Sequence, residues 1–111
     1  MRLVLTDAAK ADVLKILRDT RIKFGPVQVP KYRALISEAR KRIVENPGLG
    51  HHREGLPPEG RLFHISQRGR PARHFFLYFV DESEDVLVVV RILHDAMDMP
   101  KHWPRSMAGR R

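Results

Sequence analysis

The chain contains no cysteine. This absence excludes a disulfide framework, a thiolate metal site and a thiol nucleophile, and it fits a reducing compartment. Long hydrophobic runs are also missing. The longest, near Phe75 and Val86, have the length of a strand and fall far short of a membrane span, and the apolar start at residues 3–5 is too short for a secretory leader. We therefore expect a soluble, cytoplasmic protein.

Several motifs that mark enzymes are absent as well. The sequence has no phosphate-binding glycine loop, no G-x-S-x-G elbow and no dinucleotide fingerprint. Histidines at 51–52 could supply metal ligands, and His94, Asp98 and His102 would align on one side of a helix. Pro100 argues against a regular helix through that segment. We expect no metal and no other cofactor.

Positive charge is what the chain has in excess. Lysine and arginine number 21 against 13 aspartate and glutamate residues, which gives a formal charge of +8. Such a balance favours an acidic partner, either nucleic acid or an acidic protein segment, and a basic surface that serves only solubility also remains open. At 111 residues, with 42% hydrophobic and 31% charged residues, the composition predicts one folded domain spanning 1–111.

The first half of the chain has a helical pattern. Thr6 can cap a helix that begins at Asp7 and runs to about Phe24, where Gly25 and Pro26 end it. A second helix begins a few residues later, and Asn46 with the proline and glycine behind it ends that helix. Its apolar stripe repeats every three or four residues: Tyr32, Leu35, Ile36, Ala39 and Ile43. Two helices joined so closely predict an antiparallel hairpin.

The second half has the period of strands. We expect strands at 61–66, 73–80 and 86–93, a short first strand at 2–5, and a loop from 48 to 60. A basic turn would span 66–73, an acidic turn 81–85, and residues 104–111 would form a flexible basic tail. The pattern predicts an α+β fold with two layers and the order β-α-α-β-β-β, in which an antiparallel sheet packs on a helical hairpin.

Both faces of this sheet are apolar. Phe75, Leu77 and Phe79 alternate with Phe76, Tyr78 and Val80, and in the last strand Val86, Val88, Val90 and Ile92 alternate with Leu87, Val89 and Leu93. A layer of two helices covers one face only, so the other must be covered by the chain ends, by self-association or by a partner. The predicted partner face comprises Phe76, Tyr78, Val80, Leu87, Val89 and Trp103.

The end of the last predicted strand carries a recognisable motif. Arg91, Ile92 and Leu93 lead into His94, Met97, Asp98 and His102, which resembles the RILHxxMDxxxH signature of the ParE branch of the RelE/ParE toxin superfamily. The resemblance extends over almost the whole chain. Its other positions are Leu5, Thr6, Asp12, Ile16, Tyr32, Leu35, Ile43, residues 46–48 and residues 60–63.

The resemblance implies the toxin of a type II toxin–antitoxin module. Toxins of this branch are described as binding DNA gyrase and disturbing its cleavage and resealing of DNA. Each is neutralised by a cognate antitoxin, ParD-like or of another type, whose C-terminal region wraps the toxin. A basic chain with an uncovered apolar sheet face fits an acidic, amphipathic antitoxin tail.

The other branch of the superfamily implies an enzyme, a ribosome-dependent mRNA endonuclease. Cleavage of RNA needs a base, an acid and cations that stabilise the developing charge. The candidates for those roles are Arg61, Arg73, Arg91 and His94. The tyrosine that this branch places behind its last strand is missing, because the only tyrosines are Tyr32 and Tyr78. The resemblance therefore favours a binding toxin, and a basic domain that binds DNA or is inert remains a third reading.

A structural role competes with a functional one at the motif. His94 could hydrogen-bond to Asp98 or to the backbone, and Arg91 could pair with Asp95 or Asp98 as a clamp. Met97, Met99 and Trp103 would then pack on the sheet edge or contribute to a protein interface. These pairings predict a stapled corner at the end of the last strand.

Overall fold

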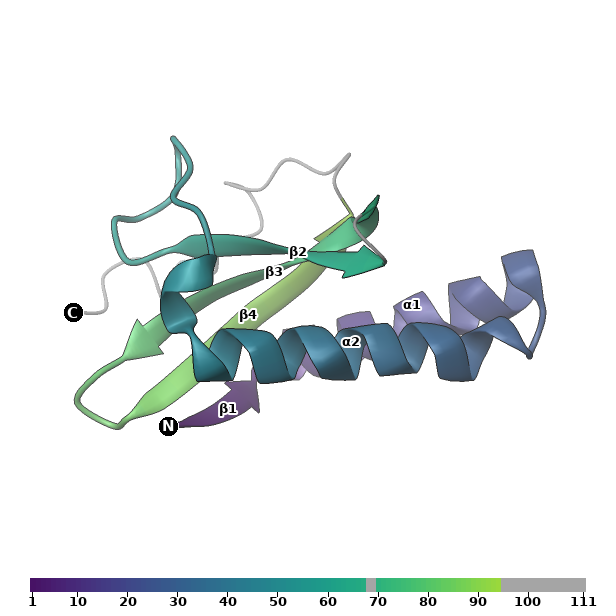
Figure 1. Cartoon of the computed structure of the whole chain (residues 1–111), viewed down its shortest axis with the longest axis horizontal. Coiled ribbons are helices and arrows are strands. Elements are labelled where there is room, and N and C mark those ends of the chain that lie inside the picture. Colours follow the sequence, from purple (N-terminus) through teal and green to yellow (C-terminus); the bar gives the residue numbers. More distant parts are fainter. Residues whose placement is uncertain (68–69, 95–111) are drawn as a thin grey trace.

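The structure is a computed structural model, and it describes residues 1–67 and 70–94, with the backbone alone described for 66–67 and 70–73. The order of elements is the predicted one (Figure 1). The elements are β1 (Arg2–Leu5), α1 (Asp7–Phe24), α2 (Gln28–Glu45), the short 3₁₀ helix η1 (Pro47–Leu49), β2 (Arg61–Gln67), β3 (Arg70–Asp81) and β4 (Val86–His94). Trp103 and the expected tail at 104–111 lie outside the described residues.

The four strands form one sheet in the order β1-β4-β3-β2. The predicted meander is present, because β2, β3 and β4 pair antiparallel with their neighbours in the chain. The first strand adds a parallel pairing, with Arg2 opposite Val86 and Leu5 opposite Val89. The sheet is therefore mixed, since the helical hairpin carries the chain from β1 back to the start of the meander.

The turn between β2 and β3 is shorter than the sequence predicted. We expected a basic turn over 66–73, but the ladder continues to Ser66 opposite Pro71 and Gln67 opposite Arg70. A proline without an N–H fits here, because among the residues that the structure describes the pairing of β3 with β4 begins at His74. Among the described residues, β3 therefore pairs with β2 alone at Pro71.

Both helices pack on the same face of the sheet, and that face is the predicted partner face. Phe76, Tyr78, Leu87 and Val89 are fully buried in one cluster with Ile16, Leu17, Ile36, Ala39 and Ile43 of the helices, and Val80 packs against it. The assignment of these strand residues to a partner was wrong. Period-2 alternation separates the two faces of a strand, but it does not say which face a helix covers.

A β-bulge in β4 also changes which side chains share a face. Tyr78 pairs with Val89 and Leu77 with Arg91, so Val90 is an extra residue. Ile92 therefore joins the helix-covered cluster and Leu93 the opposite one, the reverse of the strict alternation that we expected. Arg91, placed directly after the bulge, can reach the first helix.

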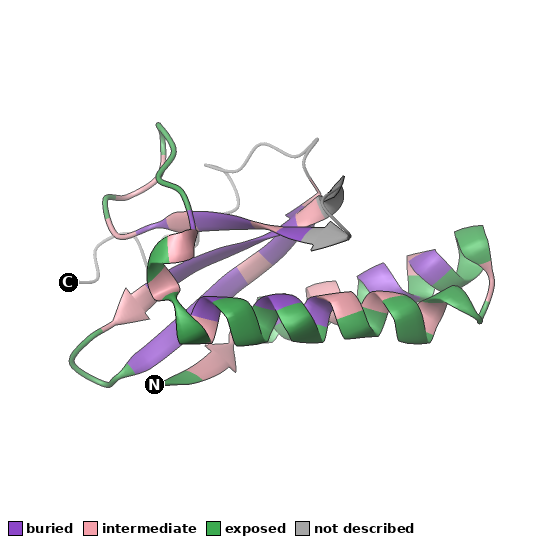
Figure 2. Cartoon of the chain, viewed as in Figure 1, coloured by how far each residue is buried: buried purple, intermediate pink, exposed green. Residues whose placement is uncertain are grey.

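The face opposite the helices forms a second apolar cluster. Among the described residues, the partly buried Val4 and Leu56 pack against it. In Figure 2 the buried residues gather on β2, β3 and β4, whereas β1 is intermediate or exposed and most other exposed residues lie on the helices and loops. The cluster comprises Leu62, Phe75, Leu77, Phe79, Val86, Val88, Val90 and Leu93.

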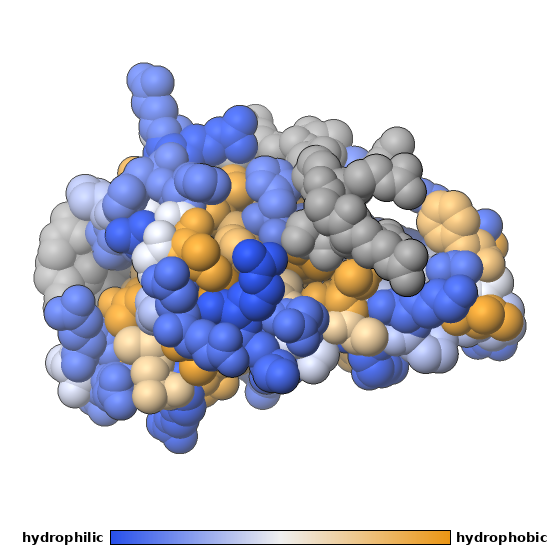
Figure 3. Space-filling view, viewed as in Figure 1, coloured by the Kyte–Doolittle hydropathy of each residue, from blue (hydrophilic) through white to orange (hydrophobic). Residues whose placement is uncertain are grey.

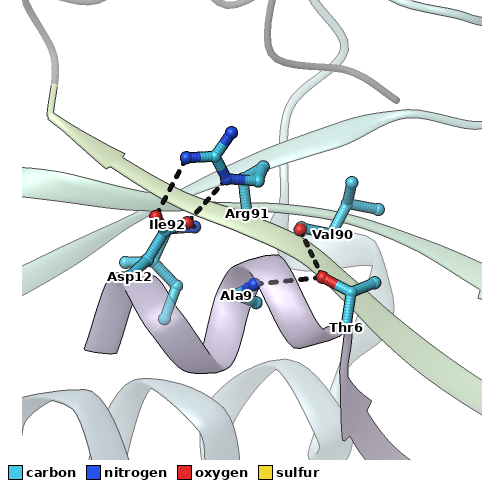
Figure 4. Close-up of polar contacts among 6 residues, drawn as sticks. All are labelled: Thr6, Ala9, Asp12, Val90, Arg91 and Ile92. Carbon is cyan, nitrogen blue, oxygen red and sulfur yellow. Dashed lines mark hydrogen bonds and ion pairs between the residues drawn. The ribbon is translucent and has the colours of Figure 1, made fainter. Parts of the chain in front are cut away.

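Thr6 joins the first strand, the first helix and the last strand. Its hydroxyl accepts a hydrogen bond from the Ala9 N–H at 3.1 Å and donates one to the Val90 carbonyl at 2.6 Å (Figure 4). We expect Thr6→Ala to lower the free energy of unfolding by about 1–2 kcal/mol, because it removes an N-cap and a long-range hydrogen bond. Urea denaturation measures the loss. Thr6→Ser is the control and should remain near wild type, and an equal loss in both variants would show that the methyl group matters instead.

Candidate functional site

Arg91 is clamped to the first helix. Its Nε donates to Asp12 Oδ2 at 2.8 Å and its Nη2 donates to Oδ1 at 2.9 Å, across 79 positions of sequence (Figure 4). The hydrogen bonds from Arg91 to Asp12 raise the pKa of the guanidinium above its ordinary value. A structural clamp was predicted, with Asp95 or Asp98 as its acid. The acid that the structure shows is Asp12, and residues 95 and 98 lie outside the described part.

The same carboxylate completes the edge of the sheet. The backbone of β1 pairs with β4 only as far as Val89. Beyond it, the Val90 carbonyl accepts from Thr6, and the Ile92 N–H donates to Asp12 Oδ2 at 2.9 Å. The side chains of Thr6, the N-cap of α1, and of Asp12 in α1 thus take the place of a neighbouring strand, which assigns Asp12 and Arg91 to the framework of the fold.

His94 belongs to a small group of rings at the end of the sheet. It lies opposite His74 in the register, with ring centroids 5.4 Å apart. Tyr32 of α2 approaches His74, with its hydroxyl 2.6 Å from the His74 Nδ1. Burial raises the pKa of Tyr32 to about 12, so the phenol keeps its proton at neutral pH and shares a hydrogen bond with Nδ1 of His74. This contact ties the second helix to the meander.

Replacing Tyr32 by phenylalanine tests this contact through pH. Because the pKa of Tyr32 is higher in the folded state, folding favours the protonated phenol. The resulting contribution to the free energy of unfolding is complete below pH 10, near the unfolded pKa, and is lost as the pH rises from about 10 to about 12. We expect Tyr32→Phe to cost about 1 kcal/mol at neutral pH and less at about pH 11. Urea midpoints at the two pH values measure the difference. If raising the pH lowered the stability of wild type and variant by the same amount, the prediction would be contradicted.

Arg61 and Tyr78 hold a loop against the opposite end of the sheet. Arg61 Nη1 donates to the Gly50 carbonyl at 2.8 Å. The Tyr78 hydroxyl donates to the Pro47 carbonyl at 2.6 Å and accepts from the Gly50 N–H at 2.9 Å. Burial raises the pKa of Tyr78, so its hydroxyl stays protonated and can make both contacts. These two residues fix the segment from Pro47 to Gly50.

The predicted catalytic candidates do not form one site. Arg61 lies opposite Tyr78, and His94 lies opposite His74, which is four residues earlier in β3. That separation is about 13 Å along the strand. For Arg73 the structure describes the backbone of β3 alone, and Met97, Asp98, His102 and Trp103 of the predicted motif and partner face lie outside the described residues.

Two members of the ring group were missed in the sequence. Tyr32 was assigned to the apolar stripe of its helix, and His74 was not considered. The register of the hairpin could have revealed His74, since a strand pair joined by an acidic turn at 81–85 brings it towards His94. Neither the apolar stripe of the helix nor the strand register indicates that Tyr32 contacts the pair of His74 and His94.

A shallow groove runs between the first strand and the second helix. Its lining is part apolar and part charged: Leu3, Ser37, Arg40, Lys41, Val44 and Glu45. The strand on this side, β1, is an edge of the sheet. An edge strand beside a basic helix face can receive an extended or helical segment of another chain. In the described residues, neither helix has the length and apolar character needed to cross a membrane.

Comparison with known proteins agrees with the fold and with the family resemblance. A family model described as the ParE toxin of the type II toxin–antitoxin system parDE matches residues 3–99. The chain is 28% identical over 106 residues to the Toxin ParE of Escherichia coli, with 96% of both proteins covered.

A solved structure is similar in shape as well. The chromosomal ParDE toxin–antitoxin system from P. aeruginosa contains a chain that superposes with a TM-score of 0.69 at 24% identity, with 85% of this chain and 95% of that one covered. This likeness concerns the fold. The family match covers most of the sequence and includes Asp12, Arg91 and His94. The chain therefore belongs to the ParE toxin family of type II toxin–antitoxin systems.

Proposed function

We propose that this toxin acts by binding DNA gyrase rather than by catalysis. The observation that carries the proposal is the role of Arg61 and Arg91, the two cationic catalytic candidates whose side chains the structure describes. Arg91 makes a two-point contact with Asp12, and Arg61 holds the Gly50 carbonyl. Both contacts serve the framework of the fold, at separate places in the sheet. Gyrase is the target that the resemblance to the ParE branch implies, and the proposal places the toxin in the cytoplasm, where gyrase works.

We also propose that a cognate antitoxin neutralises the toxin by occupying the groove between β1 and α2. The formal charge of +8 suits an acidic antitoxin segment. Arg40 and Lys41 would meet its carboxylates, while Leu3 and Val44 would meet its apolar side chains. The related P. aeruginosa structure is described as a ParDE system, which supports a ParD-like partner.

A paired assay tests the gyrase proposal. Purified toxin is added to gyrase supercoiling and cleavage reactions, and separately to translating ribosomes programmed with mRNA. We expect supercoiling to be inhibited and the mRNA to remain intact. Cleavage of mRNA at the ribosome, with gyrase unaffected at the same concentrations, would contradict the proposal.

Ribosome-dependent mRNA cleavage is the second candidate function. The group formed by Tyr32, His74 and His94 favours it, because two imidazoles and a phenol lie within ring contact at the end of β4. Imidazoles are the side chains best suited to proton transfer near neutral pH. If mRNA is cleaved, His94→Ala should abolish cleavage while the protein remains folded, and an unchanged rate would remove this group from the mechanism.

A further inference from the structure

The end of the helical hairpin lies outside the core. The last buried residue of α1 is Thr20 and the first of α2 is Ile36, and no residue between them is buried. Figure 1 shows this end projecting beyond the strands of the sheet. We name residues 21–35 the hairpin tip. On the α2 side, Val29, Tyr32 and Leu35 still pack against the core cluster and hold the tip in place, whereas residues 21–24 on the α1 side are exposed.

Three large apolar side chains of the tip are exposed. Ile22 is 74% exposed, Phe24 70% and Val27 69%. They occur within six residues around one turn, and Figure 3 shows apolar side chains gathered over this end of the molecule. Single exposed apolar residues are common on protein surfaces, but a group of this kind marks an interaction surface.

The turn that presents these residues is ordered by its own hydrogen bonds. Gly25 ends α1 with a φ of 88°, a conformation that favours glycine, and its N–H donates to the Arg21 carbonyl at 2.9 Å. The Val29 N–H donates to the Pro26 carbonyl at 3.2 Å. A partner would therefore meet a preformed shape, which reduces the entropy lost on binding.

Charge around the tip indicates the nature of the partner. Residues 15–33 contain six basic residues and one acidic residue, Asp19, which is paired with Lys15 at 2.9 Å. A second copy of the chain would bring like charges together, so self-association through the tip is disfavoured. Apolar side chains with a basic rim fit an apolar pocket with an acidic rim on another protein.

We propose that the hairpin tip is the surface through which the toxin contacts gyrase, with Ile22 and Phe24 entering an apolar pocket bordered by carboxylates. This inference rests on the proposed function. The groove beside β1 uses α2 from Ser37 to Glu45, whereas the tip ends at Leu35. Target binding at Ile22 and Phe24 of α1 and antitoxin binding along α2 thus use different parts of the helical hairpin.

The experiment measures binding of purified toxin to immobilised gyrase. The double variant Ile22→Ser with Phe24→Ser should bind about tenfold or more weakly, because two apolar side chains no longer leave water. Leu14→Ser is the matched control. Leu14 is 71% exposed on the same helix, about 12 Å from Ile22, and its loss should leave affinity unchanged. Thermal unfolding of all three proteins should coincide, since these side chains are exposed.

A charge variant tests the acidic rim. Arg21→Glu with Lys23→Glu should weaken binding and reduce its dependence on salt, whereas Lys10→Glu, at the other end of α1, should do neither.

Wild-type affinity in the double serine variant, or an equal loss in Leu14→Ser, would overturn the proposal and leave the gyrase function intact. A wild-type toxin that does not bind gyrase would instead overturn the proposed function, and this use of the tip with it. Dimers of wild type that the serine variant abolishes would identify the tip as a self-interface and also overturn the proposal.

Discussion

Replacing Asp12 by alanine is expected to lower the free energy of unfolding by about 2–4 kcal/mol, the largest loss among the substitutions considered. The carboxylate accepts from Arg91 Nε, from Arg91 Nη2 and from the Ile92 N–H. The side chains of Arg91 and Asp12 are only 24% and 13% exposed, so water replaces the lost partners poorly. Chemical denaturation at neutral pH measures the loss.

Two further variants separate charge from hydrogen bonding at this clamp. Asp12→Asn keeps an oxygen for the Ile92 N–H and should cost less than Asp12→Ala. Adding Arg91→Met to Asp12→Ala removes the cation that the first change strands, so the double variant should be more stable than the sum of the single losses predicts. Strict additivity would show that the two side chains contribute independently.

Replacing Gly50 by alanine is expected to cost about 2–3 kcal/mol. A methyl group there would lie 2.7 Å from Cε1 and 2.8 Å from Cζ of Tyr78, closer than carbon atoms approach. The ring is fully buried and its hydroxyl holds both the Pro47 carbonyl and the Gly50 N–H, so it cannot move aside without losing these hydrogen bonds. Urea denaturation measures the loss.

Gly48→Ala provides the matched control in the same loop. Its methyl group would meet only the Asn46 side chain, at 3.4 Å, and its stability should be near that of wild type. Equal losses in the two variants would mean that loop flexibility, and not the contact with Tyr78, accounts for the effect.

The sequence predicted the elements well because their signals are local. The first helix begins at Asp7 and ends at Phe24 as expected, since Thr6 and Gly25 mark its two ends. Its hairpin partner and the three meander strands also lie where the period changes. Helix capping and hydrophobic period depend on neighbouring residues, which one sequence displays in full.

The errors concern features that depend on distant residues. The side of the sheet on which the helices pack, the bulge at Val90 and the pairing of Arg91 with Asp12 all depend on tertiary contacts. Arg91 was correctly seen as a clamp because a lone charge in an apolar strand needs a partner. Its acid was sought nearby in the chain, although helix α1, far earlier in the sequence, supplies one.

The parallel pairing of β1 with β4 also has a consequence for synthesis. Leu5 meets Val89, so the sheet cannot close until the last strand has left the ribosome. At ordinary rates of translation those 84 positions take roughly 4–17 s, during which the first strand has no β4 to join. The nascent toxin would therefore lack its complete sheet until β4 has been made.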